Sequence, residues 1–139
     1  MAWLYWSLLS AVFAAVTAIL AKAGITGVNS NLATAIRTTV VVIFTWGIVA
    51  AGGRSGSLAS LSPRVWIFLT LSGIATGLSW ICYFRALQLG EASRVAPVDR
   101  LSVVFVILLA AAFLGERITA TKLAGAMLIA IGAIVLAVE

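Results

Sequence analysis

The chain has 139 residues, of which 63% are hydrophobic and only 9% are charged, and its formal net charge is +5. Because soluble domains carry about 25% charged residues, this composition excludes an ordinary soluble domain and indicates that lipid is the solvent. The basic excess includes no run with interleaved aromatic residues, so we expect contacts with membrane lipid and no nucleic-acid partner.

Five apolar stretches, each near the roughly 20 residues that a membrane-crossing helix needs, follow one another along the chain. They predict helices at about residues 3–22, 31–51, 64–89, 93–114 and 119–138. We expect the first to be retained rather than cleaved as a signal peptide, because no Lys or Arg precedes it. The stretches are too long and too evenly apolar for β-barrel strands. The predicted fold is therefore a single all-α integral membrane domain over residues 1–139.

The ends of these helices carry turn and cap signals. Ser62 and Pro63 predict the start of the third helix, with Ser as the cap and Pro in the first turn. Gly90 is expected to close that helix, and residues 115–117 are expected to form a tight turn after the fourth.

Several classes of chemistry lack their residues. The sequence holds no histidine and one cysteine, Cys82. An internal disulfide and a Ser/His/Asp triad are thereby excluded, and we expect no metal site. No glycine-rich phosphate loop is present either, so we expect no cofactor and no enzyme activity.

Polar residues inside the spans are candidates for binding a small-molecule substrate, because a ligand site needs a few placed polar groups in an apolar wall. Several repeat at helical spacing on the first and third helices, and Arg37 lies inside the second. The candidates are Ser7, Ser10, Thr17, Arg37, Thr76, Ser79, Trp80, Tyr83 and Ser102. The alternatives are that the hydroxyl groups bond their own helix backbone and that Arg37 extends to lipid phosphates.

Asp99 is the acid that we expect to be immersed in the membrane. It lies six residues after Ser93, about 9 Å along the predicted fourth helix, and Pro97 removes a backbone donor nearby. A buried carboxylate suits proton coupling, so Asp99 is the proton-coupling candidate. The alternative is a structural clamp between Asp99 and an arginine.

Small residues at helical spacing mark candidate helix-packing faces, because they allow close backbone approach. Gly73 and Gly77 form a GxxxG pair on the third helix, and Gly125 and Gly132 share a face of the fifth. The alternative is chance, since glycine is common in membrane helices.

Basic residues are divided almost evenly between the two membrane sides. The side of the N-terminus has Arg54, Arg64, Arg117 and Lys122, and the opposite side has Lys22, Arg37, Arg85, Arg94 and Arg100. Positively charged loops normally fix which side faces the cytoplasm. The near-even division favours insertion in both orientations; the alternative is one fixed orientation, if some of these residues are buried.

Residues 83–98, YFRALQLGEASRVAPV, resemble the junction of the third and fourth helices in the EamA-type domain of the drug/metabolite transporter superfamily. Leu114-Gly115-Glu116-Arg117 resembles the motif that closes its fourth helix, and Gly125 with residues 131–133 resembles the glycine pattern of its fifth. The resemblance implies a multi-pass transporter of small metabolites or drugs in a bacterial-type inner membrane.

Members of this family commonly carry two such domains as an inverted repeat, whereas this chain has one. Because each domain has an odd number of membrane spans, a second domain that follows it in the same chain crosses the membrane in the opposite orientation. In such inverted repeats, binding sites form between the two repeats near the membrane midplane. We therefore expect an antiparallel homodimer, a ten-helix bundle that works by alternating access. Residues 3–21 contain no acid, so the mechanism of the small multidrug resistance transporters, which use an acid in helix one, does not transfer. The alternative function is a non-transporting subunit that assembles with a different membrane partner.

Overall fold

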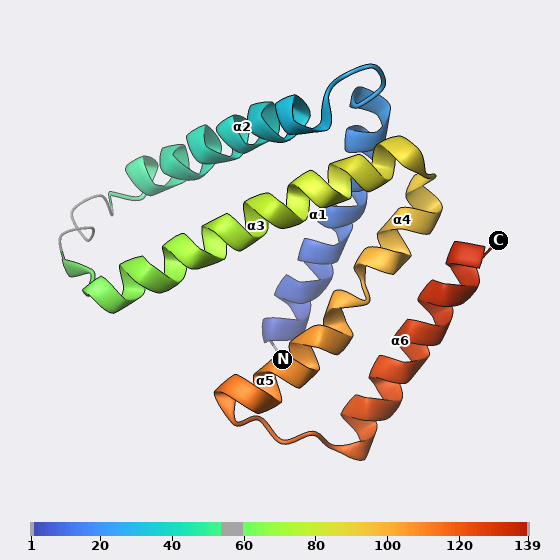
Figure 1. Cartoon of the computed structure of the whole chain (residues 1–139). Coiled ribbons are helices and arrows are strands. Elements are labelled where there is room, and N and C mark those ends of the chain that lie inside the picture. Colours follow the sequence, from blue (N-terminus) through green and yellow to red (C-terminus); the bar gives the residue numbers. More distant parts are fainter. Residues whose placement is uncertain (1, 54–59, 139) are drawn as a thin grey trace. The chain divides into compact units, whose positions relative to one another are not determined.

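The computed structural model describes residues 2–53 and 60–138. Within them the chain is helical and has no strand. The helices are α1 (Ala2–Gly24), α2 (Ser30–Ala51), α3 (Pro63–Leu89), α4 (Ala92–Asp99), α5 (Ser102–Leu114) and α6 (Ala120–Val138). Figure 1 shows them in chain order. Arg54, which the sequence places among the basic residues on the side of the N-terminus, lies outside the described residues.

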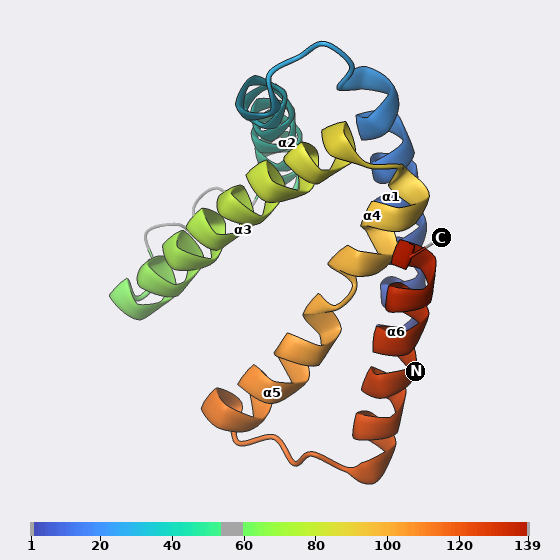
Figure 2. The same cartoon turned by 45° about the vertical axis from the view of Figure 1, so that its right-hand side comes forward.

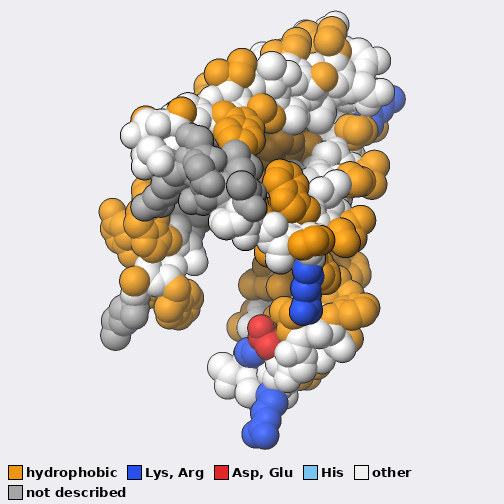
Figure 3. All heavy atoms as spheres, turned by 90° about the vertical axis from the view of Figure 1, so that its left-hand side faces the viewer, with side chains coloured by type: hydrophobic (Ala, Val, Ile, Leu, Met, Phe, Trp, Pro, Cys, Tyr) orange, Lys and Arg blue, Asp and Glu red, His pale blue; other side chains and the backbone are white. Residues whose placement is uncertain are grey.

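Five stretches of the described residues are long and apolar enough to cross a membrane, which confirms the predicted spans. They are α1, α2, α3, the segment Ala92–Leu114 that contains α4 and α5, and α6. Their apolar side chains point outward: Phe13, Phe44 and Leu128, for example, are 63%, 67% and 71% exposed. On the face drawn in Figure 3, hydrophobic side chains predominate and charged ones are few. Lipid is the solvent that such surfaces require.

The chain divides into two compact units. One contains Met1–Gly24 and Leu89–Glu139, and the other contains Ile25–Gln88. We call them the outer-sequence unit and the central unit. The central unit holds α2 and nearly all of α3, and the outer-sequence unit holds α1, α4, α5 and α6.

The helix ends follow local cap chemistry. The Asn29 side chain accepts a hydrogen bond from the backbone N–H of Asn31 at 2.9 Å and so caps α2. The Ser62 hydroxyl accepts from Val65 N at 3.4 Å, which confirms the predicted start of α3. Gly115, with φ of 67°, ends α5 in the left-handed conformation that glycine adopts without a steric penalty.

The fourth span is confirmed, but the single continuous helix predicted for it is wrong. Helix α4 ends at Asp99 and α5 begins at Ser102, and the bend between them is visible in Figures 1 and 2. Arg100 N donates to Pro97 O at 3.1 Å, and Leu101 N donates to Val98 O at 3.0 Å. These bonds span three residues instead of four, the tighter geometry of a 3₁₀ turn. Pro97 itself lacks the donor that would close the preceding turn.

Small residues lie where α6 packs in the outer-sequence unit. This helix contacts both α4 and α5, and its most buried side chains are Ala126 and Ala133, at 5% and 4% exposure. The seven-residue spacing puts both on one face. The Lys22 ammonium, near the end of α1, donates to Gly90 O at 2.8 Å. This bond links α1 to the turn before α4.

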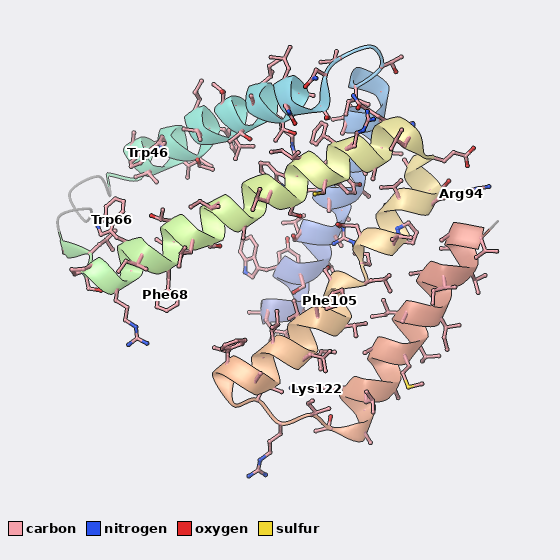
Figure 4. The ribbon with its side chains drawn as sticks, in the orientation of Figure 1. Trp46, Trp66, Phe68, Arg94, Phe105 and Lys122 are labelled. Carbon is pink, nitrogen blue, oxygen red and sulfur yellow. The ribbon has the colours of Figure 1, made fainter. Side chains whose placement is uncertain are left out.

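Aromatic side chains mark one end of the pair α2–α3. Figure 4 shows Trp46, near the end of α2, and Trp66, near the start of α3, at the same end of this pair. Their exposed fractions are 49% and 50%. Tryptophan prefers the membrane–water interface, so this end of the central unit is expected to lie at a membrane surface.

Candidate functional site

The substrate-binding candidates fall into both units. Arg37 on α2 and four residues of α3, Thr76, Ser79, Trp80 and Tyr83, belong to the central unit. Ser7, Ser10 and Thr17 on α1, Asp99 at the end of α4 and Ser102 at the start of α5 belong to the outer-sequence unit. The clearest arrangement of side chains is in the central unit.

Arg37 and Trp80, both predicted from the sequence, come into direct contact. The guanidinium carbon of Arg37 lies over the Trp80 ring, 4.1 Å from its centroid. The same carbon is 5.6 Å from the centroid of the Phe84 ring. An arginine over aromatic faces is held by attraction between its charge and the π electrons. We call Arg37, Trp80 and Phe84 the Arg37 cluster.

Phe84 is the member of this cluster that the sequence reasoning missed. Its side chain is 4% exposed, and Leu87, one turn further along α3, is fully buried. An apolar ring in a membrane helix gives no sign by itself that it faces inward. The available signal is spacing, because Trp80, Phe84 and Leu87 recur at four and three residues and therefore share a face of the helix.

Three further interactions involve Arg37 or the adjoining ends of α2 and α3. Tyr83 interacts electrostatically with Arg37. The Gln88 side-chain amide donates to the carbonyl of Val28, just before α2, and the Arg85 guanidinium donates to Gln88 Oε1 at 3.3 Å. The start of α2 is thereby tied to the end of α3, which positions Arg37 opposite the aromatic residues.

Threonines form a row on α2 that the sequence reasoning did not single out. Thr34, Thr38 and Thr45 recur at spacings of four and seven, so they share one face. Thr34 is only 6% exposed. Each hydroxyl donates at 2.8 Å to the carbonyl four residues earlier. This bonding satisfies the hydroxyl groups inside an apolar segment.

The same backbone bonding holds two of the predicted substrate residues. Ser7 Oγ donates to Trp3 O, and Thr76 Oγ1 donates to Ser72 O, each at 2.8 Å. For these two residues, the geometry matches the alternative to substrate binding, in which a hydroxyl group bonds the backbone of its own helix. Four other candidates make no side-chain hydrogen bond to a described residue of their own unit: Ser10, Thr17, Ser79 and Ser102.

Asp99 is exposed and lies at the last position of α4, where the helix is interrupted. The ion pairs among the described residues join Arg94 with Glu91 at 3.6 Å and Lys122 with Glu116 at 3.0 Å. Asp99 takes part in neither, so within the outer-sequence unit it is not clamped by an arginine. Proton coupling at Asp99 stays a prediction.

The four glycines predicted to pack helices have open space around them. A Cβ atom built on Gly73, Gly77, Gly125 or Gly132 would meet nothing within 4 Å beyond its own helix. The close helix contact of α6 uses Ala126 and Ala133 instead. Helix packing at these glycines stays a prediction. It requires a further helix that approaches these faces.

Metal ligation has no visible basis in residues 2–53 and 60–138. Among them, no three His, Cys, Asp or Glu side chains group closely enough to hold an ion.

Comparisons with known proteins identify the family of this chain. The sequence model of the EamA-like transporter family matches residues 1–138. A protein of Sinorhizobium sp. named "Uncharacterized transporter in cobO 3'region" is 50% identical over 136 residues, covering 98% of this chain and 96% of the relative. No solved structure matches the chain. With five membrane-length helices among its described residues, the chain is a multi-pass membrane protein that belongs to the EamA-like transporter family.

Proposed function

We propose that the protein is a secondary transporter that moves small organic metabolites or drugs across a cell membrane by alternating access. The observation that carries the proposal is the Arg37 cluster, a cation held on aromatic rings inside a span of a transporter-family chain. Ionisable groups within membrane segments are costly and typically mark solute pathways. The rings supply apolar contact area, and the guanidinium supplies orientation.

The interrupted fourth span supports the same function. Transporter sites commonly lie where a membrane helix is broken, because the freed backbone groups and nearby side chains contact the solute or the coupling ion. Asp99 ends α4 eight residues into the segment Ala92–Leu114, about 10 Å along its axis. We propose that Asp99 carries the coupling proton.

Two copies in opposite orientations would complete the bundle. Five spans per copy give ten in the pair, and an inverted pair has the symmetry that alternating access uses. The open faces at Gly73, Gly77, Gly125 and Gly132 provide close-approach surfaces for the second copy.

Uptake into proteoliposomes tests the proposed function. Purified protein in liposomes should accumulate members of a panel of small organic solutes above the level of protein-free liposomes. Uptake that equals the protein-free level for every solute would contradict transport and favour the non-transporting subunit.

Orientation in the cell tests the antiparallel pair. Fusions of a C-terminal reporter that is active only in the cytoplasm, and of one active only outside it, should both give signal. Arg117→Gln leaves three basic residues against five, and should shift the signal toward a cytoplasmic C-terminus. Signal from one native fusion alone would exclude the antiparallel pair.

A further inference from the structure

We infer that Arg37 binds a single carboxylate of the transported solute, so that the substrates are organic anions or zwitterions. This inference rests on the proposed transport function and names the substrate class of the Arg37 cluster. Four observations support it: the central unit shows no hydrogen-bond acceptor for the guanidinium, it contains no acid, Arg37 lies well inside its helix, and the cluster has a single charge.

The guanidinium lies over two aromatic ring faces, which do not accept its N–H groups as a carboxylate would. Trp80 and Phe84 contact it through their ring faces, at 4.1 and 5.6 Å from the centroids. Its five N–H donors lie in its own plane and point outward along its edge. Within the central unit, no described residue accepts a hydrogen bond from Arg37. The edge of a guanidinium has the geometry that pairs with both oxygens of a carboxylate.

The central unit contains no acid to neutralise this charge. The four acidic residues of the chain are Glu91, Asp99, Glu116 and Glu139, all after residue 88. A guanidinium in a low-dielectric segment is costly without a negative partner. The partner must therefore come from outside the unit, and a solute anion meets this need.

The depth of Arg37 argues against simple extension to the lipid headgroups. Arg37 lies seven residues after the start of α2, about 10 Å along the axis. Trp80 lies nine residues before the end of α3, about 14 Å from the same end of the pair. Since helical side chains tilt toward the N-terminus of their helix, the Trp80 ring points further inward. Contact with Trp80 holds the guanidinium at this depth.

The charge of the cluster favours one carboxylate over a dianionic phosphate. Arg37 is the one cation among the three residues of the cluster. The other two described arginines of the central unit have partners of their own: Arg64 lies 5.8 Å from the Phe68 centroid, and Arg85 donates to Gln88 Oε1 at 3.3 Å. One guanidinium neutralises one negative charge. A phosphate dianion would keep a charge in the apolar segment, which is costly.

Uptake of matched acids and amides tests the inference in the native protein. The probes are hydroxy, keto, amino and aromatic carboxylic acids, each with its neutral or cationic amide, in phosphatidylcholine liposomes. Because hydrogen bonds to charged groups are strong, we expect transported acids to exceed their amides roughly tenfold to a hundredfold. Uptake of amides at the rate of the acids would overturn the inference while leaving transport standing. Uptake of none of these probes would also overturn the inference, and only uptake of no solute of the wider panel would refute the proposed function.

Variants then assign the preference to Arg37. Arg37→Gln should remove the preference for acids, and Arg37→Lys, which keeps the charge but loses the planar pair of donors, should retain part of it. Arg64→Gln is the matched control, an arginine beside an aromatic ring of the same unit, and should keep the native ratio. Circular dichroism and size-exclusion profiles equal to the native ones establish that each variant folds. An unchanged ratio in folded Arg37→Gln would overturn the inference.

Liposome composition separates a solute carboxylate from a lipid phosphate as the anion. If a lipid phosphate occupied Arg37, adding phosphatidylglycerol would change native uptake of acids and amides alike, and Arg37→Gln would abolish that change. We expect the ratio of acid to amide uptake to be the same with and without phosphatidylglycerol. A preference for acids over amides that is present only with phosphatidylglycerol would overturn the inference that Arg37 binds a carboxylate of the solute.

Discussion

Trp80→Ala is expected to raise the KM for the best-transported carboxylate roughly thirtyfold. The substitution removes the ring that lies 4.1 Å from the Arg37 guanidinium, and a desolvated cation–π contact contributes about 2 kcal/mol. Without this platform, Arg37 is free to extend toward the lipid headgroups. Trp80→Phe keeps an aromatic face and should raise the KM less. Initial rates of uptake into proteoliposomes over a range of solute concentrations give the values.

Trp66→Ala provides the control on the same helix. Trp66 is 50% exposed near the start of α3, at the end of the pair α2–α3 that is remote from the Arg37 cluster. It should change protein yield more than KM. Equal KM values for the Trp80 and Trp66 variants would show that Trp80 does not position Arg37 for the solute.

Asp99→Asn is expected to abolish solute accumulation driven by a pH gradient. Asparagine has nearly the same shape as aspartate but does not take up and release a proton. A gradient of one pH unit corresponds to a factor of about ten per proton, so native protein coupled to one proton should accumulate solute up to roughly tenfold. The variant should only equilibrate the solute. Exchange of labelled for unlabelled solute at equal pH should persist, because exchange needs no net proton movement.

Glu116→Gln is the matched control for the proton. Glu116 lies after α5 and pairs with Lys122 at 3.0 Å, outside the interrupted part of the fourth span. Its variant should accumulate solute as the native protein does. Gradient-driven accumulation that survives in Asp99→Asn would exclude Asp99 as the proton carrier.

The positions of the spans could be predicted from the sequence because hydrophobicity alone decides them. Residues predicted at 3–22 form α1 over Ala2–Gly24, and those predicted at 64–89 form α3 over Pro63–Leu89. The interruption after Asp99 was not predicted, although the sequence showed that Pro97 removes a backbone donor just before it. The interruption arises because the N–H groups of Arg100 and Leu101 bond to carbonyls three residues earlier instead of four. The amino-acid composition does not determine which of these two hydrogen-bond patterns forms.

The candidate site was predicted in part. Arg37 and Trp80 were each recognised as polar or aromatic residues inside a span, but their contact joins two helices and so depends on tertiary packing. Phe84 was missed because an apolar ring in a membrane helix is equally compatible with lipid. The row of Thr34, Thr38 and Thr45 was visible in the spacing, and its hydroxyl groups bond their own helix.

The central claim is that two five-span chains pair to form one transporter. Its most direct test counts the copies of the chain that transport requires. Native protein with a fluorescent C-terminal tag is reconstituted at less than one pair per liposome on average, and bleaching steps and solute uptake are recorded for each liposome. The account predicts uptake in liposomes with two or more bleaching steps and none in those with one. Uptake by liposomes that hold a single copy would contradict the pairing of two five-span chains.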